Sequence, residues 1–524
     1  MEGGPKAKRQ RRANDAQEHT ALAWLLGAAA TPSAFLRDHW EHKPLHARRD
    51  ASRTAPLFCA ETLLDLAERR ELRYERDLNV VNCPDGRNKQ VVHDSGSRAT
   101  AAQLRGYLGL DNTKKGSAST VQFFQPQRYV DELWHRMADL EAEFSSLWGA
   151  NVYLTAGGTQ GLAPHFDDVE VFVLQMTGTK RWKVHGPSEA FHELATECSG
   201  DLEELGELLL DVELAPGDLL YLPRGTTHYA VAGAGEPSVH ITISTYQKHT
   251  WHSLLDKSFT RLVDAAASTD IEFRRGLPVG YLWQNGTWRA DPSKVPNELC
   301  SNVARLLRRM ADALEEGRVD EDESVAQALH EAVDSYALDF IANRLPRPGA
   351  NKVDGGPIVG PEDVAAAARG KVRLADPRWL HVAPEAVIAD ELDGDDGEEH
   401  EEGDQEAEGN RYGEDEEAQE DDSAAGEGDG GIYDDKDSDD EEEEEDTDDA
   451  VRVFTTVANE RELHMGPAQP PQAAAASTLG AGGRQVLDKL RAAYPKAIPG
   501  SALGEWLAPL LFCGAVELDG AKSK

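Results

Sequence analysis

Residues 169–176 form a near-continuous run of β-branched, aromatic and aliphatic side chains, VEVFVLQM, which ends at the turn Thr177-Gly178. Such a run, bounded by turn residues, predicts a buried strand in a barrel wall or a sandwich core. A second short apolar run at 219–222 lies between the turn signals PGD and PRG and predicts another strand. Alternation over 151–155 predicts a third strand, so this part of the chain is rich in β-structure.

Beyond residue 251 the apolar positions recur every three or four residues, which predicts helices. Residues 303–314 have this spacing, and residues 325–345 repeat it. Apolar faces on such helices are most simply explained by packing within one molecule. The pattern therefore predicts a helical region after the β-rich one.

Polar residues with metal-binding chemistry stand beside the predicted strands. His165 and Asp167 come just before the first strand, and side chains two positions apart in an extended segment point to the same face. His228 follows the turn at 223–225, which aims its imidazole back toward that face. Two imidazoles and one carboxylate are a set that holds Fe(II) and leaves the opposite coordination positions open.

Simpler interpretations of these residues exist. A His-x-Asp pair arises by chance in many chains, and Asp168 is a second carboxylate beside Asp167, although only Asp167 shares a face with His165. His185 lies past the strand and is interpreted as a satisfied or exposed histidine. The metal interpretation is favoured because four features occur in order: His-x-Asp, a strand, Lys180 after a turn, and the segment G-x5-P-x-G-x2-H that ends at His228.

A longer pattern surrounds these residues. The stretch NVYLTAGGTQGLAPHFDDVEVFVLQMTGTKRWKVHGP, followed by LAPGDLLYLPRGTTHYA and HITISTYQKHTW, resembles the JmjC-domain ribosomal oxygenases. The similarity is densest over 151–251, continues more weakly at 24–48 and 272–278, and is greatest to the nuclear branch, the bifunctional lysine-specific demethylases and histidyl-hydroxylases. A generic cupin would not also carry the lysine and the STYQ-x-x-TW segment.

The resemblance implies a role for each matching residue. His165, Asp167 and His228 match the iron ligands, and Lys180 matches the lysine that binds the distal carboxylate of 2-oxoglutarate. A buried ammonium suits such an anion, whereas composition alone would favour a lysine at a surface turn. Four further positions match residues that bind the cosubstrate or line its pocket, although inward polar residues of a barrel are often structural: Asn151, Tyr153, His240 and Ser244.

The implied activity is that of a dioxygenase that uses Fe(II), with 2-oxoglutarate and O2 as cosubstrates. Its implied protein substrate is a ribosomal-protein histidine, which would be hydroxylated, or histone methyl-lysine, which would be demethylated in chromatin and transcription regulation. The residues do not separate these two substrates. A non-catalytic cupin-like protein that binds chromatin or serves ribosome biogenesis is the alternative, and the intact triad with Lys180 argues against it. A third alternative is an oxygenase that acts on a small molecule or on tRNA. The sequence shows no basic groove for tRNA, which makes this alternative less favoured.

Length and composition set further bounds. A chain of 524 residues suggests about three domains. Its 5 cysteines are scattered without CxxC spacing, which argues for a reducing compartment and against a disulfide framework or structural zinc. No apolar run approaches the ~18 residues of a membrane span, so we expect a soluble, intracellular protein without a membrane partner.

Charge is distributed unevenly along the chain. Residues 390–449 hold 34 acidic residues against 2 basic ones, so −32 of the formal net charge of −41 lies there. This tract has almost no aliphatic residues and cannot bury enough surface to fold. It is either a solvated spacer or an attractor of basic partners such as ribosomal proteins and histone tails. At the other end, KAKRQRR at residues 6–12 fits a patch for localisation to the nucleus or nucleolus.

These features predict a mixed α and β protein in several parts. The parts are a basic tail at 1–18, a JmjC catalytic domain on a cupin-like double-stranded β-helix barrel at 19–250, a helical dimerisation region at 251–348, and a C-terminal winged-helix domain at 356–520, interrupted by an acidic insertion at 389–449. The resemblance implies both the homodimer and the winged helix. Residues 450–524 hold 8 Lys and Arg against 6 Asp and Glu, so we expect protein contacts there rather than strong binding to nucleic acid.

Overall fold

The computed structural model describes residues 20–49, 57–111, 119–187, 193–198, 205–247, 249–281, 298–317 and 324–345, and short segments between residues 371 and 518. The predicted basic tail and acidic insertion lie outside the described residues. No helix in the described part of the chain combines the length and apolar character needed to cross a membrane.

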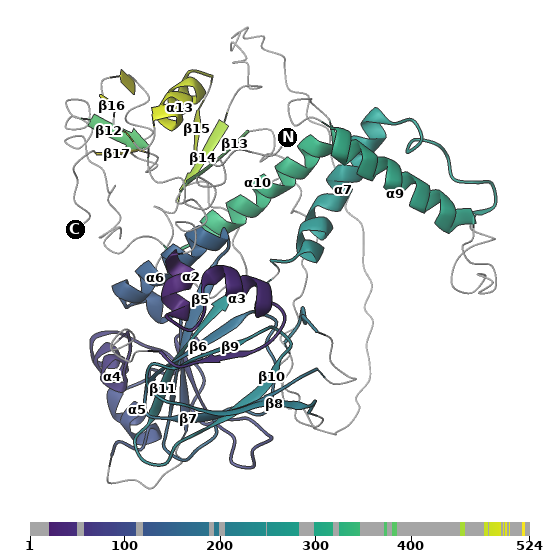
Figure 1. Ribbon diagram of the computed structural model, residues 1–524. Coiled ribbons are helices and arrows are strands. Elements are labelled where there is room, and N and C mark those ends of the chain that lie inside the picture. Colours follow the sequence, from purple (N-terminus) through teal and green to yellow (C-terminus); the bar gives the residue numbers. More distant parts are fainter. Residues whose placement is uncertain are drawn as a thin grey trace, which may run out of the picture.

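Two antiparallel sheets form the β-rich part of the chain (Figure 1). The larger has eight strands in the order β1-β9-β6-β11-β5-β4-β2-β3, and the smaller has three in the order β10-β7-β8. The strands are β1 (Leu45–Ala47), β2 (Leu78–Asn82), β3 (Gln90–Val91), β4 (Thr120–Phe124), β5 (Trp148–Thr155), β6 (Val171–Thr177), β7 (Lys180–His185), β8 (Leu208–Leu214), β9 (Leu219–Leu222), β10 (Thr227–Ala232) and β11 (Ser238–Thr245). Because β6 and β7 follow each other but belong to different sheets, the chain alternates between the two layers, as in the predicted barrel.

Alternate residues of the large sheet face two different cores. In β6, Phe172 and Leu174 belong to the main apolar core with the surrounding helices, whereas Val171 and Val173 pack with Trp182 of the small sheet. A strand with apolar residues on both faces is buried on both sides, which explains the continuous apolar run in the sequence. Polar side chains that replace these apolar residues between the two sheets are therefore candidates for function.

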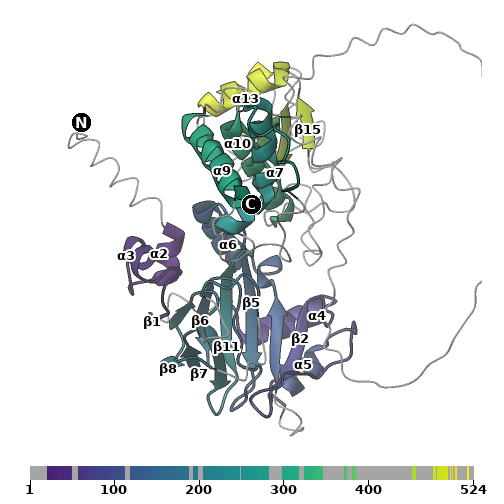
Figure 2. The same cartoon turned by 90° about the vertical axis from the view of Figure 1, so that its right-hand side faces the viewer.

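Short helices cover the outer face of the large sheet (Figure 2). They are α2 (Thr20–Leu26), α3 (Pro32–Asp38), α4 (Ala60–Arg69), α5 (Ala101–Tyr107), the 3-10 turn η2 (Pro126–Arg128) and α6 (Asp131–Phe144). Thr100 caps α5 in a capping box with Gln103, and Thr31 caps α3 just before Pro32. Capping residues of this kind satisfy the free N–H groups of the first turn and fix where each helix begins.

The predicted strands are confirmed with small shifts. Residues 219–222 form β9, residues 151–155 lie within β5, and the apolar run at 169–176 corresponds to β6. The extended-strand interpretation of His165 and Asp167 needs a correction. His165 lies in an isolated bridge opposite His228, and Asp167 lies in the loop that follows it. Next to this bridge, the N–H of Gly225 donates to the carbonyl oxygen of Asp167.

Three long helices follow the sheets: α7 (Trp251–Thr269), α9 (Glu298–Glu316) and α10 (Val325–Asn343). They confirm the helical region predicted at 303–314 and 325–345. The end of α10 lies against α6 (Figure 1). There Arg344 Nε donates to Glu141 Oε2 at 2.7 Å, and Trp134 Nε1 donates to the carbonyl of Leu345 at 3.3 Å.

The described segments beyond residue 370 form two small antiparallel sheets, in the orders β16-β12-β17 and β13-β14-β15. Their elements are β12 (Lys371–Leu374), β13 (Leu380–Pro384), β14 (Val451–Thr455), β15 (Ala476–Leu479), α13 (Ala481–Ala493), β16 (Ile498–Pro499) and β17 (Val516–Leu518). The winged-helix assignment of this region stays a prediction.

Candidate metal centre

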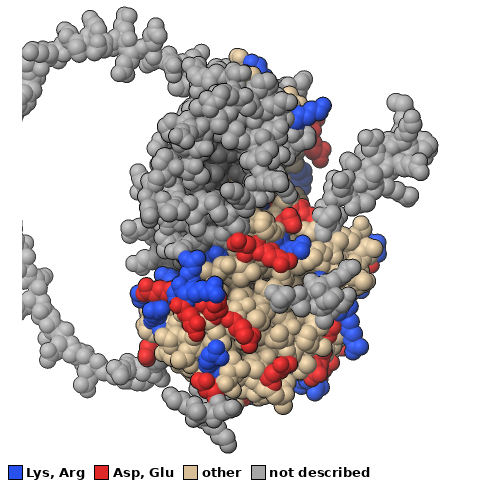
Figure 3. Space-filling view, turned by 90° about the vertical axis from the view of Figure 1, so that its left-hand side faces the viewer, with Lys and Arg blue, Asp and Glu red and all other residues tan. Residues whose placement is uncertain are grey.

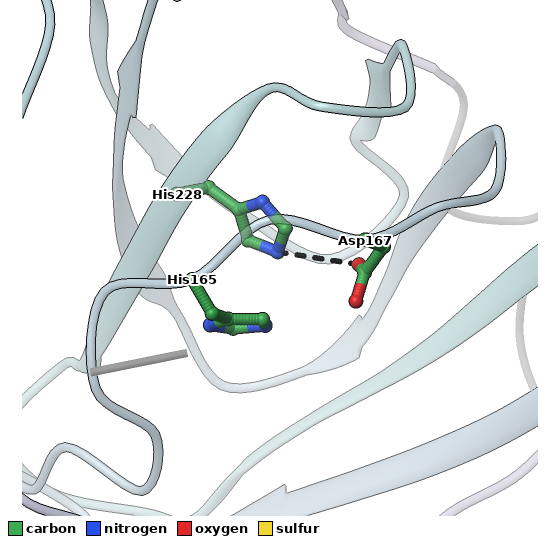
Figure 4. A group of neighbouring side chains, drawn as sticks. All are labelled: His165, Asp167 and His228. Atoms are coloured by element: carbon green, nitrogen blue, oxygen red, sulfur yellow. Dashed lines mark ion pairs between the residues drawn. The ribbon is translucent and has the colours of Figure 1, made fainter. Parts of the chain in front are cut away.

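Two histidines and one aspartate converge between the sheets (Figure 4). One possible ligand atom from each of His165, Asp167 and His228 lies within 4.8 Å of the others. The two histidines face each other across a backbone bridge, with N–H to carbonyl distances of 3.2 and 2.8 Å in the two directions. His228 Nε2 lies 3.7 Å from Asp167 Oδ2. The structure therefore brings together the three residues that the sequence analysis singled out.

Backbone carbonyls orient both imidazoles. His165 Nδ1 lies 2.8 Å from the carbonyl oxygen of Ala163, and His228 Nδ1 lies 2.9 Å from that of Thr226. A carbonyl only accepts hydrogen bonds, so each Nδ1 carries the proton and donates it. Each Nε2 is left with a lone pair, which is the form in which imidazole binds a metal.

The protonation of His228 also suits a ligand. Burial, followed by the neighbouring His165, lowers the pKa of His228 to about 4. Its imidazole is therefore neutral at pH 7, and no proton has to leave before a cation binds. The nearby carboxylate of Asp167 supplies the negative charge that offsets part of a divalent cation.

Asp167 and its neighbour Asp168 have different partners. The backbone carbonyl of Asp167 accepts the N–H of Gly225 at 2.8 Å, which fixes the loop while its carboxylate stays with the histidines. The carboxylate of Asp168 instead accepts Gln247 Nε2 at 3.1 and 2.8 Å. This contact ties the loop to the end of β11 and supports Asp167 over Asp168 as the ligand.

A cavity opens beside the triad, with a lysine in its wall. The lining residues are Thr120, Tyr153, Gly161, Leu162, His165, Asp167, Val171, Val173, Lys180, Trp182, His228, Tyr229, Ala230, His240 and Thr242. Lys180 is buried, its Nζ donates to Thr155 Oγ1 at 3.1 Å, and burial lowers its pKa to about 7. No described carboxylate forms an ion pair with it. A buried ammonium facing a cavity in this way suits an anionic ligand.

The four predicted pocket residues divide into two pairs. Tyr153 and His240 line the cavity and stack on each other, with ring centroids 4.9 Å apart and planes at 4°. Asn151 and Ser244 lie on the same strands but outside this lining. The side-chain oxygen of Asn151 accepts the N–H of Gln125 at 3.3 Å. This contact holds the turn at Gln125, where φ is +46°, and fits a supporting position.

Several lining residues were not predicted. Thr120 Oγ1 donates to Thr155 Oγ1 at 3.1 Å, so two hydroxyls stand behind Lys180. Thr155 lies two residues after Tyr153 on β5, so both side chains point to the same face of the strand. This spacing is a sequence signal from which Thr155 could have been predicted. Gly161 leaves room for Thr120, because a Cβ there would lie 2.0 Å from Thr120 Oγ1. His185 was predicted not to be a ligand; it lies outside the triad, and its Nδ1 donates to the carbonyl oxygen of Gly206 at 2.9 Å.

The described surface near the β-rich region mixes both charges. Figure 3 shows acidic and basic side chains interspersed around an uncharged area on that face. Oppositely charged side chains also pair on the small sheet, where Arg181 Nε lies 2.6 Å from Asp211 Oδ1. The visible face thus has no extended basic patch among its described residues.

Comparison with known proteins bears on this site. Residues 122–254 match the JmjC domain family, a range that includes the triad and Lys180. The chain therefore contains a region that matches the JmjC domain, and it is similar to the ribosomal oxygenases. It is 39% identical over 319 residues to Ribosomal oxygenase 2 of Rattus norvegicus, covering 60% of this chain and 62% of that protein. It is 32% identical over 369 residues to Ribosomal oxygenase 1 of Danio rerio, covering 69% and 61%.

The chain spans less than two thirds of the length of these relatives. Identity to the two kinds of ribosomal oxygenase is similar, so it does not single out the predicted nuclear branch. Among solved structures, YcfD, a ribosomal oxygenase from Escherichia coli in complex with cobalt and 2-oxoglutarate, aligns with a TM-score of 0.42 at 15% identity, covering 94% of this chain and 99% of that chain.

Proposed function

We propose that this chain is a protein oxygenase that depends on Fe(II) and 2-oxoglutarate. The observation that carries the proposal is the His165, Asp167 and His228 group beside the buried, cavity-facing Lys180. Both halves are needed, because a triad alone fits several metal functions and a buried lysine alone is only an anion site.

The donor set fits iron. Two neutral imidazoles and one carboxylate occupy one face of an ion and leave the other face to small ligands. With 2-oxoglutarate and O2, iron supplies the oxidising power needed to hydroxylate a C–H bond. The chain would hold the ion through the two Nε2 atoms and the Asp167 carboxylate, whose orientation the backbone contacts have already set.

The cavity fits a dicarboxylate. Lys180 would hold the distal carboxylate, with Thr155 as a hydroxyl neighbour and Tyr153 stacked on His240 along the wall. Burial disfavours the charged form of Lys180 in the free protein. A bound carboxylate would stabilise the ammonium and so offset this desolvation cost. Trp182, whose ring lies 5.7 Å from Lys180 Nζ, and the apolar Val171 and Val173 keep water from the anion.

We propose a histidyl residue of a ribosomal protein as the substrate. The related proteins carry the name ribosomal oxygenase, which supports this substrate class over others. Demethylation of histone methyl-lysine would use the same oxidising chemistry on an N-methyl group, and no feature of the cavity favours it. A chromatin role would rest on that second activity.

The test incubates purified full-length protein with Fe(II), 2-oxoglutarate and a panel of ribosomal-protein and methylated histone peptides, followed by mass spectrometry. Gain of one oxygen on a histidine supports the proposal, whereas loss of a methyl group from lysine would replace the proposed substrate. The matched control is His165→Ala, which should abolish either product. Absence of all 2-oxoglutarate turnover by folded, iron-loaded protein would contradict the oxygenase function.

We also propose that the chain forms a homodimer through its helical region. Trp251, Leu255 and Phe259 stand four residues apart on α7 and are 81%, 51% and 45% exposed. Val303 and Leu307 repeat this spacing on α9, at 47% and 42% exposed. Apolar stripes of this kind mark surfaces that pack against another protein, and the proposed partner is a second copy of this chain.

Light scattering after size exclusion tests the dimer. Wild-type protein should have twice the chain mass, and Trp251→Glu with Leu255→Glu should have the mass of one chain. Val279→Glu is a matched control, because Val279 is 99% exposed away from the stripe on α7. A wild-type monomer at micromolar concentration would contradict the proposal.

We propose a nuclear, and within it nucleolar, location on the basis of the basic cluster at residues 6–12, which lies outside the described residues. A fluorescent fusion should concentrate in the nucleus, and replacing Lys6, Lys8, Arg9, Arg11 and Arg12 by alanine should spread it through the cell. An unchanged distribution would show that this cluster does not direct localisation.

A further inference from the structure

A buried glutamate lies just outside the metal-facing cavity. Glu170 stands three residues after Asp167, where the ligand loop enters β6, and its side chain is only 4% exposed. Its partner Tyr221 belongs to the main core on the outer side of the large sheet. The cavity lining does not include Glu170, so it has no place in binding the metal or the dicarboxylate directly.

Glu170 is the centre of a four-residue network. The hydroxyl of Tyr221 donates to its Oε2, and the backbone N–H of Arg224 lies 3.4 Å from its Oε1. The Tyr221 oxygen in turn accepts the N–H of Glu41 at 2.9 Å, and Arg224 Nη2 donates to Glu41 Oε1 at 2.9 Å. Glu41 has a φ of +57°, which a non-glycine residue adopts only when its surroundings hold it. The network therefore ties together three separate segments.

The segment that contains Arg224 contacts both Asp167 and His228. Arg224 is followed by Gly225, whose N–H holds the carbonyl of Asp167 at 2.8 Å. Next comes Thr226, whose carbonyl accepts the proton of His228 Nδ1 at 2.9 Å. A shift of this turn would move the support of Asp167 and the orientation of His228 together.

We propose that Glu170 is a positioning residue for the metal centre: by binding Tyr221 and the backbone of Arg224, it fixes the turn that orients Asp167 and His228. The inference rests on the proposed metal site and adds the residue that keeps its ligands in register. Groups that orient metal ligands at one remove commonly change metal affinity by about 10- to 100-fold when they are lost.

The charge on Glu170 is set by its surroundings. Burial is the main cause that raises its pKa, to about 7, and Glu41 adds to it, while Tyr221 and Arg224 act in the opposite direction. Arg224 Nε is buried without a hydrogen-bond acceptor among the described residues and lies 3.8 Å from Glu170 Oε1. The pKa of Glu170 in the folded protein lies above that of an unfolded glutamate. The contribution of Glu170 to the free energy of unfolding is therefore fully present below about pH 4.5 and is lost as the pH rises to about 7.

Metal affinity is the first test. Cobalt(II) binding to the metal-free full-length protein is measured by calorimetry for Glu170→Gln, Glu170→Met and Tyr221→Phe. Glutamine resembles the protonated carboxyl, because its oxygen can accept the N–H of Arg224 and its NH2 group can donate to the Tyr221 oxygen. The affinity of Glu170→Gln should therefore stay within about threefold of wild type, whereas Met should weaken binding by about tenfold or more. Tyr221→Phe keeps the ring in the core and should fall between them. Glu213→Gln, an exposed carboxylate on β8, is the matched control and should match wild type.

Wild-type affinity in both Glu170→Met and Tyr221→Phe would overturn the inference. A wild-type protein that binds no cobalt would instead overturn the proposed function and, with it, the role toward a metal. These two failures are distinguishable, because the first leaves a working metal site and the second leaves none.

Thermal unfolding of the metal-free protein is the second test, and it does not depend on activity. From pH 5 to pH 8, wild type should lose stability relative to Glu170→Gln, because only wild type must ionise a buried carboxyl. The same comparison with Glu213→Gln should show no such change. A constant difference between wild type and Glu170→Gln across this range would overturn the assignment of Glu170 as the titrating group of the network.

Discussion

At the scale of single residues, backbone carbonyls determine how the metal ligands point. Ala163 and Thr226 each accept the Nδ1 proton of an imidazole, so each Nε2 is left free to bind an ion beside Asp167. The grouping of these three side chains could be predicted from the sequence, because residue type and order are enough. Their orientation could not, since it depends on a bridge between segments 63 positions apart, His165 with His228.

The two neighbouring aspartates provide a residue-scale prediction. Asp167→Ala should abolish cobalt binding and turnover, because it removes the only carboxylate of the triad. Asp168→Ala should retain metal affinity within about tenfold, since Asp168 contacts Gln247 and acts on the loop from outside. Calorimetry with cobalt(II) checks both variants. Greater loss of affinity in Asp168→Ala than in Asp167→Ala would show that the ligand assignment is wrong.

Lys180 makes a prediction about pH. In the free protein burial lowers its pKa to about 7, so the ammonium is present below that pH and is lost above it. Binding of 2-oxoglutarate needs the charged form, and its affinity should fall by up to about tenfold per pH unit above pH 7. Calorimetry on metal-loaded protein from pH 6.5 to pH 9 measures this fall.

Two variants control the lysine experiment. Lys180→Met should weaken 2-oxoglutarate binding at every pH, because no cation remains. Lys180→Arg keeps a charge that does not titrate in this range, so its affinity should change less with pH than that of wild type. An equal pH dependence in wild type and Lys180→Arg would assign the titration to another group.

At the scale of elements, turn residues decide how well a boundary can be predicted. Strand β9 lies between Gly217 and Pro223 and was predicted to the residue. The apolar run at 169–176 has no such marker at its start, and β6 begins two residues later, at Val171. The structure also pairs strands that are distant in sequence, such as β6 with β11 and β9. This pairing could not be predicted, because it leaves no pattern in the local sequence.

The contact between α6 and the end of α10 makes an element-scale prediction. Glu141 and Arg344 form a buried ion pair, in which burial raises the pKa of Glu141 and Arg344 opposes the shift. Arg344→Met leaves a buried charge without its partner, a change that typically costs about 3–5 kcal/mol. Thermal unfolding should therefore show a clear drop in melting temperature.

A double variant separates the ion pair from packing. Adding Glu141→Gln to Arg344→Met removes the stranded charge and should recover part of the lost stability. Arg309→Met is a matched control, because Arg309 pairs with Asp270 on the surface, where such pairs contribute little. Strictly additive losses in the double variant would contradict coupling between Glu141 and Arg344.

At the scale of the whole molecule, the JmjC domain and the helices that follow it are the parts that the sequence and the structure describe alike. The main core joins α2 to α6 with the outer face of the large sheet, which leaves its inner face for the cavity. The net charge of −41 says little about this domain, because −32 of it belongs to residues 390–449. The winged-helix assignment beyond residue 356 stays a prediction.

Oxygen labelling tests the central claim, that the triad and Lys180 together form a 2-oxoglutarate oxygenase. The full-length protein is supplied with Fe(II), 2-oxoglutarate, a ribosomal-protein peptide and isotopically labelled O2, and both products are analysed by mass spectrometry. One labelled atom should appear in succinate and one in the hydroxylated histidine, and neither product should form with Asp167→Ala. Folded, iron-loaded wild-type protein that forms no succinate, or a peptide that gains its oxygen from water, would contradict the account.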